Sequence, residues 1–538
     1  MKTLPSSLND ADKVELRGRI FQNLDGIAIT PTIIALDQKG IIEDFLERKI
    51  LSLSWVIENT NGNEGYVNVG LRLLSSQGWL EVCESTGDIE YQLTDSGTAV
   101  FKSVSAYNSV LDFFLEALNF SENLKNGFSV QNLEIIEDVL RLKSQGWRLD
   151  YYELSDDQKR QIEAHLEGVL IGPFMTGLGM QGYLTKMIGS GTFDESDFQE
   201  DFGSIIKALF VQMSWLSAQT NQLTSKGVFM LKRAAAYGVT VSYFKTFTWV
   251  KDLMYGKANK LWDKELTDPE IHVDRAMNVW GSGGAHGTYF KVIDEIVREI
   301  FNRPIDQQPR GITDMGCGNG AFLEHLFNLI YNETERGKVM DEHHLLVLGS
   351  DFNEAALEVT RENLTRAEIE HYTMWGDIGD PDRLAADVKK EYGVNLSDML
   401  NVRSFLDHNR IFTPCSGDFY QRQGTSTGSF SYRGRRITNS EIEQNLFEHF
   451  RKWMPYVERF GLLVIELHTI HPTVAAKNLG KVAITAYDGT HGYSDQYIVE
   501  HDVFTRLAAE AGLKVSPDCQ ALYPNAEMPV VSINLLKS

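Results

Sequence analysis

The chain has 538 residues, 51 Lys and Arg against 74 Asp and Glu, and a formal net charge of −23 at pH 7. Its length is enough for roughly two to four domains with sizeable cores. The acidic balance argues against sequence-independent binding to nucleic acid or to acidic membranes, because neutralising phosphates requires clustered Lys and Arg.

The cysteines carry no pairing motif, which predicts a reducing, cytoplasmic location and no disulfide framework. They are Cys83, Cys317, Cys415 and Cys519. The first residues have no apolar signal core, and no apolar run reaches about 18 residues, so no membrane association is expected.

Residues 1–104 are predicted to form an N-terminal helical and winged-helix domain. A helix is expected over 66–78, a strand over 79–83 and a second strand entering a helix cap over 91–97. The recognition-like helix offers only Arg72, and the wing is acidic, so a packing or dimerisation module is favoured over DNA binding. This run resembles the N-terminal winged helix of many O-methyltransferases, which makes a homodimer plausible.

Residues 105–275 have mostly helical periodicity and many aromatic residues. The segment is either simple core or a helical lid over a substrate tunnel, and we assign it as the lid. Gly and Pro in 172–182 predict a flexible turn. Four glycines around His286, in 279–290, predict either a linker or a loop that closes over a ligand.

Residues 276–538 alternate strand and helix, which predicts a doubly wound α/β sheet. The strands are expected at 311–315, 345–350, 373–377, 396–402, 461–466, 513–515 and 530–536. In such sheets ligands bind outside the carboxyl ends of the strands.

The first of these strands runs through Asp314 into a turn with Gly316, Gly318 and Gly320, and an amphipathic helix follows. Such a turn lets the backbone pass close to a ligand. A carboxylate at Asp314 would attract an ammonium group and repel pyrophosphate. Asp351, at the end of the next strand, can accept both ribose hydroxyls, and Asp377 can accept from an adenine amino group. The set favours S-adenosylmethionine over a dinucleotide.

These positions resemble the motifs of class I S-adenosylmethionine-dependent methyltransferases. The run Asp-Met-Gly-Cys-Gly-Asn-Gly ending at Gly320 matches the first motif, and Gly-Asp-Ile ending at Ile378 matches the adenine motif. The expected fold class is a Rossmann-like α/β methyltransferase core with an N-terminal winged helix and a helical lid. The resemblance implies these cofactor-binding residues: Asp314, Gly316, Cys317, Gly318, Gly320, Asp351, Phe352, Asp377, Ile378 and Asn401.

The acceptor side is expected after the fourth and fifth strands, where several His residues follow at 408, 468, 471 and 491, the last of them in a loop expected over 486–497. One interpretation makes a His the general base for a hydroxyl or an acidic carbon, since its ordinary pKa near about 6.5 suits that task. The other lets His and Gln hold a divalent metal that stabilises an enolate. The sequence lacks a compact metal-binding signature.

The arrangement and the runs at 280–286, 403–410 and 490–496 resemble the C-methyltransferases of polyketide synthase loading modules of the apratoxin starter-unit type. That resemblance implies methyl transfer to the α-carbon of a malonyl-type acyl group on an acyl carrier protein, with or without decarboxylation. It also implies a mononuclear iron or manganese ion held by His491 and Gln496. The implied catalytic residues are His468 and His408 as base candidates, Arg403 for the substrate carboxylate and Tyr487 for the enolate.

Two alternatives remain at this stage. A metal-independent small-molecule O-methyltransferase would need only a His base and an apolar acceptor pocket. A non-catalytic regulator would combine the winged helix with a decayed cofactor fold, although the complete set Asp314, Asp351 and Asp377 argues against decay.

Overall fold

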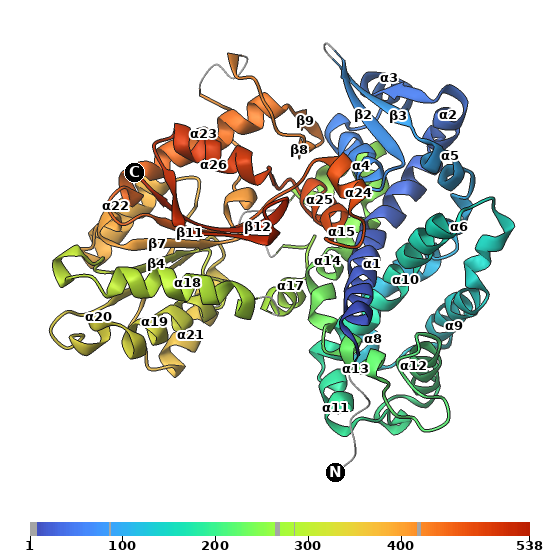
Figure 1. Cartoon of the computed structure of the whole chain (residues 1–538), viewed down its shortest axis with the longest axis horizontal. Helices are drawn as coiled ribbons and strands as arrows, with labels where there is room; N and C mark the ends of the chain where they lie inside the picture. The colour runs from blue at the N-terminus through green and yellow to red at the C-terminus, as the bar shows by residue number, and fades with distance from the viewer. Residues whose placement is uncertain (1–7, 86–87, 264–269, 284–285, 417–420) are drawn as a thin grey trace. The chain divides into compact units, whose positions relative to one another are not determined.

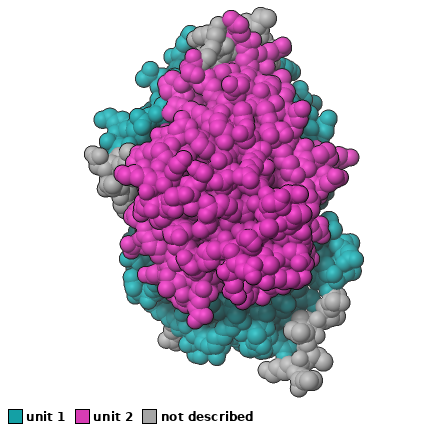
Figure 2. Space-filling model, turned by 90° about the vertical axis from the view of Figure 1, so that its left-hand side faces the viewer, with its two compact units in different colours: residues 1–285, 431–436, 471–495 teal, residues 286–430, 437–470, 496–538 magenta. Residues whose placement is uncertain are grey.

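The computed structural model describes residues 8–85, 88–263, 270–283, 286–416 and 421–538. The chain forms two compact units, coloured separately in Figure 2. Unit 1 contains residues 1–285, 431–436 and 471–495, and unit 2 contains residues 286–430, 437–470 and 496–538. The main break lies near the predicted start of the α/β core at 276. Two short segments of that predicted core nevertheless fold with unit 1.

Unit 2 is built on a seven-stranded sheet with the order β11-β12-β10-β7-β4-β5-β6. Strands β6, β5, β4, β7 and β10 run parallel, whereas β12 pairs antiparallel with both β10 and β11. The strand bounds are β4 Gly311–Met315, β5 Leu346–Asp351, β6 Tyr372–Trp375, β7 Leu400–Ser404, β10 Leu462–Leu467, β11 Lys514–Asn525 and β12 Met528–Lys537. The order reverses at β4, so its carboxyl end opens beside β7 and forms the crevice typical of doubly wound folds.

Helices cover both faces of this sheet (Figure 1). One layer consists of α18 His286–Phe301, α19 Ala321–Glu333 and α21 Glu354–Arg366, and the other of α22 Pro381–Tyr392, α23 Asn439–Val457 and α26 His501–Glu510. Their apolar residues recur every three or four positions, as an amphipathic helix requires. In α23, Ile442, Leu446, Phe450 and Trp453 are all buried.

Unit 1 contains the expected winged helix. Its elements are α2 Ile41–Arg48, β1 Ile50–Ser52, α3 Leu53–Thr60, α4 Glu64–Ser76, β2 Leu80–Ser85 and β3 Asp88–Leu93. The three strands form one antiparallel sheet with the order β1-β3-β2. Every residue of α4 from Gly65 to Ser76 is buried, so this helix presents no face to solvent.

The rest of unit 1 is helical. Two long helices, α1 Asp10–Asp37 and α10 Asp156–Met180, pack against each other, and shorter helices surround them (Figure 1). The shorter ones include α5 Asp95–Lys102, α6 Ser105–Asn108, α9 Val130–Ser144, α11 Tyr183–Ser190, α12 Glu200–Gln212, α13 Ser225–Leu231, α14 Gly238–Ser242, α17 Arg275–Gly283, α24 Pro472–Lys477 and α25 Ile484–Gly492. Within the described residues, no helix is long and apolar enough to cross a bilayer.

Three predicted irregular segments are helical, so those predictions were wrong. The turn expected at 172–182 lies mostly inside α10, where Gly172 lets Val241 and Ile27 approach closely, and tertiary packing thus overrides a low helix propensity. The loop expected at 279–290 is the end of α17 and the start of α18, while Gly284 and Ala285 lie outside the described residues. The loop expected after β10 contains α25.

One strand also begins later than predicted. Residues Leu396–Asp398 form a 3-10 turn, and β7 starts only at Leu400.

Candidate functional site

The glycine turn between β4 and α19 takes a conformation that only glycine adopts readily. Gly316, Gly318 and Gly320 have φ values of 76°, 58° and 77°. The Gly316 and Cys317 amides donate to the Ser350 carbonyl at 2.7 and 3.1 Å, which fixes the turn to the end of β5. No atom lies within 4 Å of where a Cβ on Gly318 would stand, so a ligand can approach the backbone there.

Asp314 is a buried acid that has no ion-pair partner among the described residues. It is only 2% exposed, and its Oδ1 has no hydrogen-bond partner among the described residues. Burial, with a smaller contribution from the Asp351 charge, raises the pKa of Asp314 well above its usual value. A cationic ligand would stabilise the carboxylate, whereas an anionic pyrophosphate would be repelled.

Asp351 ends β5 and faces the same turn. Its Oδ2 accepts from the Gly318 amide at 3.0 Å, and its Oδ1 accepts from the Asn353 amide at 2.9 Å. The carboxylate is thereby oriented beside the glycine turn, where a ribose would be expected.

The expected adenine end is flanked by aromatic side chains. The Phe352 and Trp375 rings are 5.3 Å apart, and Trp375 Nε1 donates to the Phe352 carbonyl at 2.9 Å. Asp377 Oδ1 accepts from the Gly379 amide at 2.7 Å, and the Ile378 carbonyl accepts from Trp453. Asp314 and Asp351 lie in the carboxyl halves of β4 and β5, and Asp377 follows the end of the adjacent β6.

Two predicted cofactor residues point elsewhere. The Cys317 thiol is buried 3.5 Å from Thr360 Oγ1, and burial raises its pKa. The Asn401 amide donates to the carbonyls of Leu396, Met399 and Tyr456 at the start of β7. Asn401 thus secures the amino end of its strand, and the structure does not bring its side chain to the glycine turn.

S-adenosylmethionine fits these residues. Its sulfonium and ammonium groups supply the positive charge that Asp314 lacks, and its ribose and adenine match the placement of Asp351 and Asp377. When bound, it supplies an activated methyl group.

On the acceptor side, His408 and Glu466 form a buried dyad. His408 follows β7 and Glu466 lies in β10; they are 6% and 2% exposed. His408 Nδ1 hydrogen-bonds Glu466 Oε1, which also accepts from the Leu467 amide at 2.7 Å. An ionised carboxylate only accepts, so His408 carries its proton on Nδ1 and a lone pair on Nε2. That is the tautomer a general base requires.

Arg403, predicted to hold a substrate carboxylate, is instead paired within the fold. Its guanidinium bonds Asp407 and lies 4.0 Å above the Trp453 ring. Asp407 also accepts from His449 Nε2 at 2.8 Å. Although burial alone would raise it, the Arg403 charge and His449 hold the pKa of Asp407 below its usual value. Arg403 is fully buried, which is the placement of a structural cation.

His468, the other base candidate, is also committed to the fold. Its Nε2 bonds Ser532 Oγ at 2.7 Å, and its Nδ1 bonds the Val499 carbonyl at 3.1 Å. The side chain is fully buried, and burial lowers its pKa to about 3. Since both nitrogens are engaged inside the core, we favour His408 over His468 as the base.

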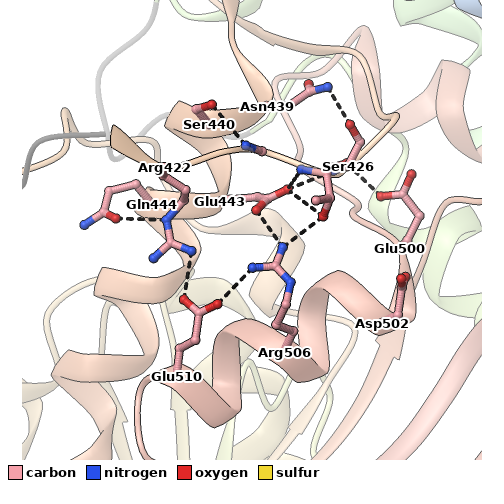
Figure 3. A network of polar contacts seen from close by, with 12 residues as sticks. Arg422, Ser426, Asn439, Ser440, Glu443, Gln444, Glu500, Asp502, Arg506 and Glu510 are labelled. Carbon is pink, nitrogen blue, oxygen red and sulfur yellow. Dashed lines mark hydrogen bonds and ion pairs between the residues drawn. The ribbon is translucent and has the colours of Figure 1, made fainter. Parts of the chain in front are cut away.

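The loop between the dyad and α23 is held by a polar network (Figure 3). Glu443 of α23 accepts from the amides of Thr425 and Ser426 at 2.6 and 2.8 Å and from Arg506 of α26 at 2.7 Å. Ser426 Oγ donates to Glu500 at 2.7 Å. The acceptor-side loop is therefore fastened to two helices of the core.

The predicted metal ligands belong to different units, His491 to unit 1 and Gln496 to unit 2. His491 Nδ1 lies 2.7 Å from the Tyr487 carbonyl, so its proton is on Nδ1 and its lone pair on Nε2. Tyr487 itself is partly buried, and this burial raises its pKa to about 12. Across the described ranges, no group of three or more His, Cys, Asp and Glu side chains could hold a metal ion.

Sequence reasoning missed the partners of these residues. The sequence predicts Glu466 only as the last residue of a strand, and it gives His449 no predicted role. The available signal was an acid inside the apolar run Leu-Leu-Val-Ile-Glu-Leu of β10, because a buried charge needs a partner.

Three protein-family models match different parts of the chain. The AprA MT2-like domain matches residues 270–534, the AprA N-terminal domain residues 16–82 and the AprA winged helix domain residues 167–257. The last match falls in the segment predicted as a lid. No curated protein sequence matches the chain.

Solved structures resemble the chain only weakly. An O-methyltransferase family 2 protein from Planctomyces limnophilus in complex with apigenin aligns with TM-score 0.37 and 9% identity over 100% of this chain and 98% of that chain. Human N-acetylserotonin methyltransferase aligns with TM-score 0.25 and 10% identity over 99% and 100%. These values are too low to bear on activity.

The family matches together span most of the chain, and the cofactor side has the charge and turn that a sulfonium donor needs. The chain is an S-adenosylmethionine-dependent methyltransferase, and residues 270–534 resemble the AprA MT2-like domain.

Proposed function

We propose that the protein methylates the α-carbon of a malonyl-type acyl group carried by an acyl carrier protein. The observation that carries this proposal is the buried His408–Glu466 dyad beside the cofactor end of the sheet. The match of residues 270–534 to the AprA MT2-like domain supports the proposal, because the resemblance to apratoxin-type C-methyltransferases implies a carrier-bound acyl group.

In this mechanism Glu466 fixes the His408 proton on Nδ1 and stabilises the imidazolium that forms when Nε2 removes the α-proton. The substrate enolate then attacks the methyl carbon, and S-adenosylhomocysteine leaves. Burial of the dyad keeps water from competing for the base and strengthens its attraction to the carboxylate. Loss of carbon dioxide would create an enolate at the same α-carbon without a base and without the carboxylate, so dependence on His408 distinguishes the two routes.

Tyr487 of α25 is proposed to orient the enolate. Burial keeps the Tyr487 hydroxyl protonated at neutral pH, which suits a donor to an enolate oxygen. A metal-assisted form would add iron or manganese bound by His491 and Gln496. The tautomer of His491 supports ligation, but the described residues give no complete ligand set, so we assign the metal no step.

The remaining partners follow from the same proposal. No nucleic acid takes part in this proposal, and the burial of α4, the helix that would read DNA, supports that choice. Its reaction requires the carrier protein in a separate chain or domain and no membrane.

The second candidate is a metal-independent O-methyltransferase, since a His base polarised by a carboxylate would also activate a phenol. Incubating the protein with the methyl donor and either malonyl-carrier protein or a panel of phenols, each with and without chelator, separates the candidates by product mass. We expect methylation of the carrier-bound acyl group only. Methylation of phenols alone would overturn the proposal, and chelator-sensitive turnover would establish the metal-assisted form.

A further inference from the structure

The two long helices of unit 1 share a sequence. Residues 20–31 read Ile-Phe-Gln-Asn-Leu-Asp-Gly-Ile-Ala-Ile-Thr-Pro, and residues 162–173 read Ile-Glu-Ala-His-Leu-Glu-Gly-Val-Leu-Ile-Gly-Pro. Ile, Leu, Gly, Ile and Pro recur at the same places without a gap. The match continues to the left-handed glycines after each helix, Gly40 with φ 83° and ψ 0° and Gly182 with φ 82° and ψ −3°.

The elements that follow each helix repeat in the same order. α2 and α11 both have 8 residues, α4 and α12 both have 13, and α5 corresponds to α13. The second segment has no named strand but contains two isolated bridges, Thr192 with Gln222 and Leu216 with Leu223. Their counterparts in the winged helix, Ile50 with Gln92 and Leu80 with Leu93, are paired in its sheet. The second segment is therefore a winged helix with a shortened wing.

The turn before the last helix is the same in both segments. The sequences Gln-Leu-Thr-x-x-Gly end at Gly97 and Gly227. A Cβ on Gly97 would stand 2.0 Å from the Trp79 carbonyl oxygen, and one on Gly227 would stand 2.1 Å from that of Trp215. Both tryptophans are fully buried, so the two copies need the same glycine for the same close approach.

The two copies contact each other reciprocally. By sequence, Asn23 of α1 corresponds to His165 of α10, and Tyr107 to Tyr237. The Tyr107 hydroxyl bonds His165 Nδ1 at 2.9 Å, and the Tyr237 hydroxyl donates to Asn23 Oδ1 at 3.0 Å. When residue i of one copy meets residue j of the other and the equivalent pair meets in return, the interface has two-fold symmetry.

The closest approach between the helices follows the same rule. A Cβ on Gly26 would stand 2.1 Å from the His165 Cα, and one on Gly168 would stand 2.0 Å from the Asn23 carbonyl oxygen. Gly26 and Gly168 are counterparts, so each glycine admits the backbone of the other copy. A cavity of about 1370 Å³ is lined in part by counterparts and in part by residues outside both copies, such as Ala476 and Lys481. Among the counterparts are the pairs Leu16 and Gln158, Gln77 and Met213, and Ser96 and Lys226.

We infer that residues 10–108 and 156–237 are two copies of one winged-helix module, and that the face formed by α1 is a pairing face whose partner is the second copy in the same chain. The α1–α10 contact is thus an intrachain counterpart of a homodimer interface. This inference is independent of the proposed function and replaces the homodimer expected from a single winged helix.

The two copies differ in the helices that pack over α4 and over its counterpart α12. In the first, α4 packs against α24 and α25, and in the second, α12 packs against α9. The corresponding acids Asp25 and Glu167 each hold a covering segment. Asp25 Oδ1 accepts from the Ala486 amide of α25 at 3.0 Å, and Glu167 accepts from Lys143 of α9 at 2.6 Å. Each recognition-like helix is therefore covered from within unit 1.

The test uses the full chain with Gly26→Ala, Gly168→Ala and the matched control Gly189→Ala, an exposed helical glycine with no atom within 4 Å of the added Cβ. Both interface variants are expected to lower the midpoint of thermal unfolding by several degrees and by similar amounts, while the control does not lower it. Sedimentation of the wild-type chain should give the monomer mass of 60.8 kDa.

If the alanine variants fail to fold, Tyr107→Phe and Tyr237→Phe remove one hydroxyl from each reciprocal bond, and their effects on the midpoint should agree within about twofold. Two results would overturn the inference. One is a strong effect from one member of a pair and none from its counterpart. The other is a wild-type dimer that Tyr107→Phe and Tyr237→Phe dissociate, since the pairing would then join two chains.

Discussion

Asp314 and Asp407 are both buried acids of unit 2, but their surroundings shift their pKa values in opposite directions. Asp407 is bonded by Arg403 and His449, and its pKa is lowered. Both acids have one buried oxygen without a hydrogen-bond partner, but Asp314 has no ion pair among the described residues, and its pKa is raised. We conclude that Asp407, which is ion-paired, stabilises the fold. Asp314, which has no ion pair among the described residues, is placed to bind a cationic ligand.

The His408–Glu466 dyad is a third case, in which a buried carboxylate is paired with the histidine that we propose as the general base. We expect His408→Gln to lower turnover about 10²- to 10⁴-fold, because general-base catalysis is lost, while cofactor affinity is kept. Steady-state kinetics and calorimetric titration measure the two quantities. His344→Gln, at an exposed histidine paired with Glu370, is the control. Equal turnover of the two variants would contradict the role of the dyad.

Asp314→Asn should change cofactor affinity and folding stability in opposite directions. Removing the carboxylate is expected to weaken S-adenosylmethionine binding about 10²-fold, because a buried charge pair is lost. The same change should raise the thermal midpoint of the ligand-free protein, since an unpaired buried acid disappears. Asp341→Asn, at an exposed acid, is the matched control. Unchanged affinity would show that Asp314 does not face the donor.

Asp407→Asn should have the opposite effect on stability. It leaves the Arg403 guanidinium buried without its counter-charge and is expected to cost about 3 kcal/mol. Denaturant unfolding measures the loss, and Asp387→Asn, in an exposed pair with Arg383, provides the comparison. If both variants unfolded alike, the contrast between paired and unpaired acids would fail.

The smallest expected effect is that of His468 on the pH dependence of folding stability. Its pKa falls from 6.5 to about 3 on folding because burial disfavours the charged form. Between these values the unfolded chain binds more protons, so the contribution of His468 to stability is present above pH 6.5 and is lost as the pH falls toward 3. His468→Gln should flatten this part of the stability profile. An unchanged slope would remove His468 as a cause.

The cofactor side could be predicted from sequence because its signal is local. Asp314, the glycines and Asp351 lie next to strand ends that periodicity identifies, and the structure places them together. The acceptor side could not, since His408 meets Glu466 and Asp407 meets His449 only after the chain folds. Gly172 and Pro173 predict a turn from their local propensity, but they are helical. The packing that keeps them helical comes from α1 and α14, which are distant in sequence.

The most direct test of the account is where the methyl group goes. Malonyl-carrier protein is incubated with the enzyme and S-adenosylmethionine labelled in its methyl group, and the released acyl product is analysed by NMR. The account predicts that the label lies on the α-carbon with the wild-type enzyme and that the His408→Gln variant yields little product. A label on oxygen, or no transfer to the acyl group, would contradict it.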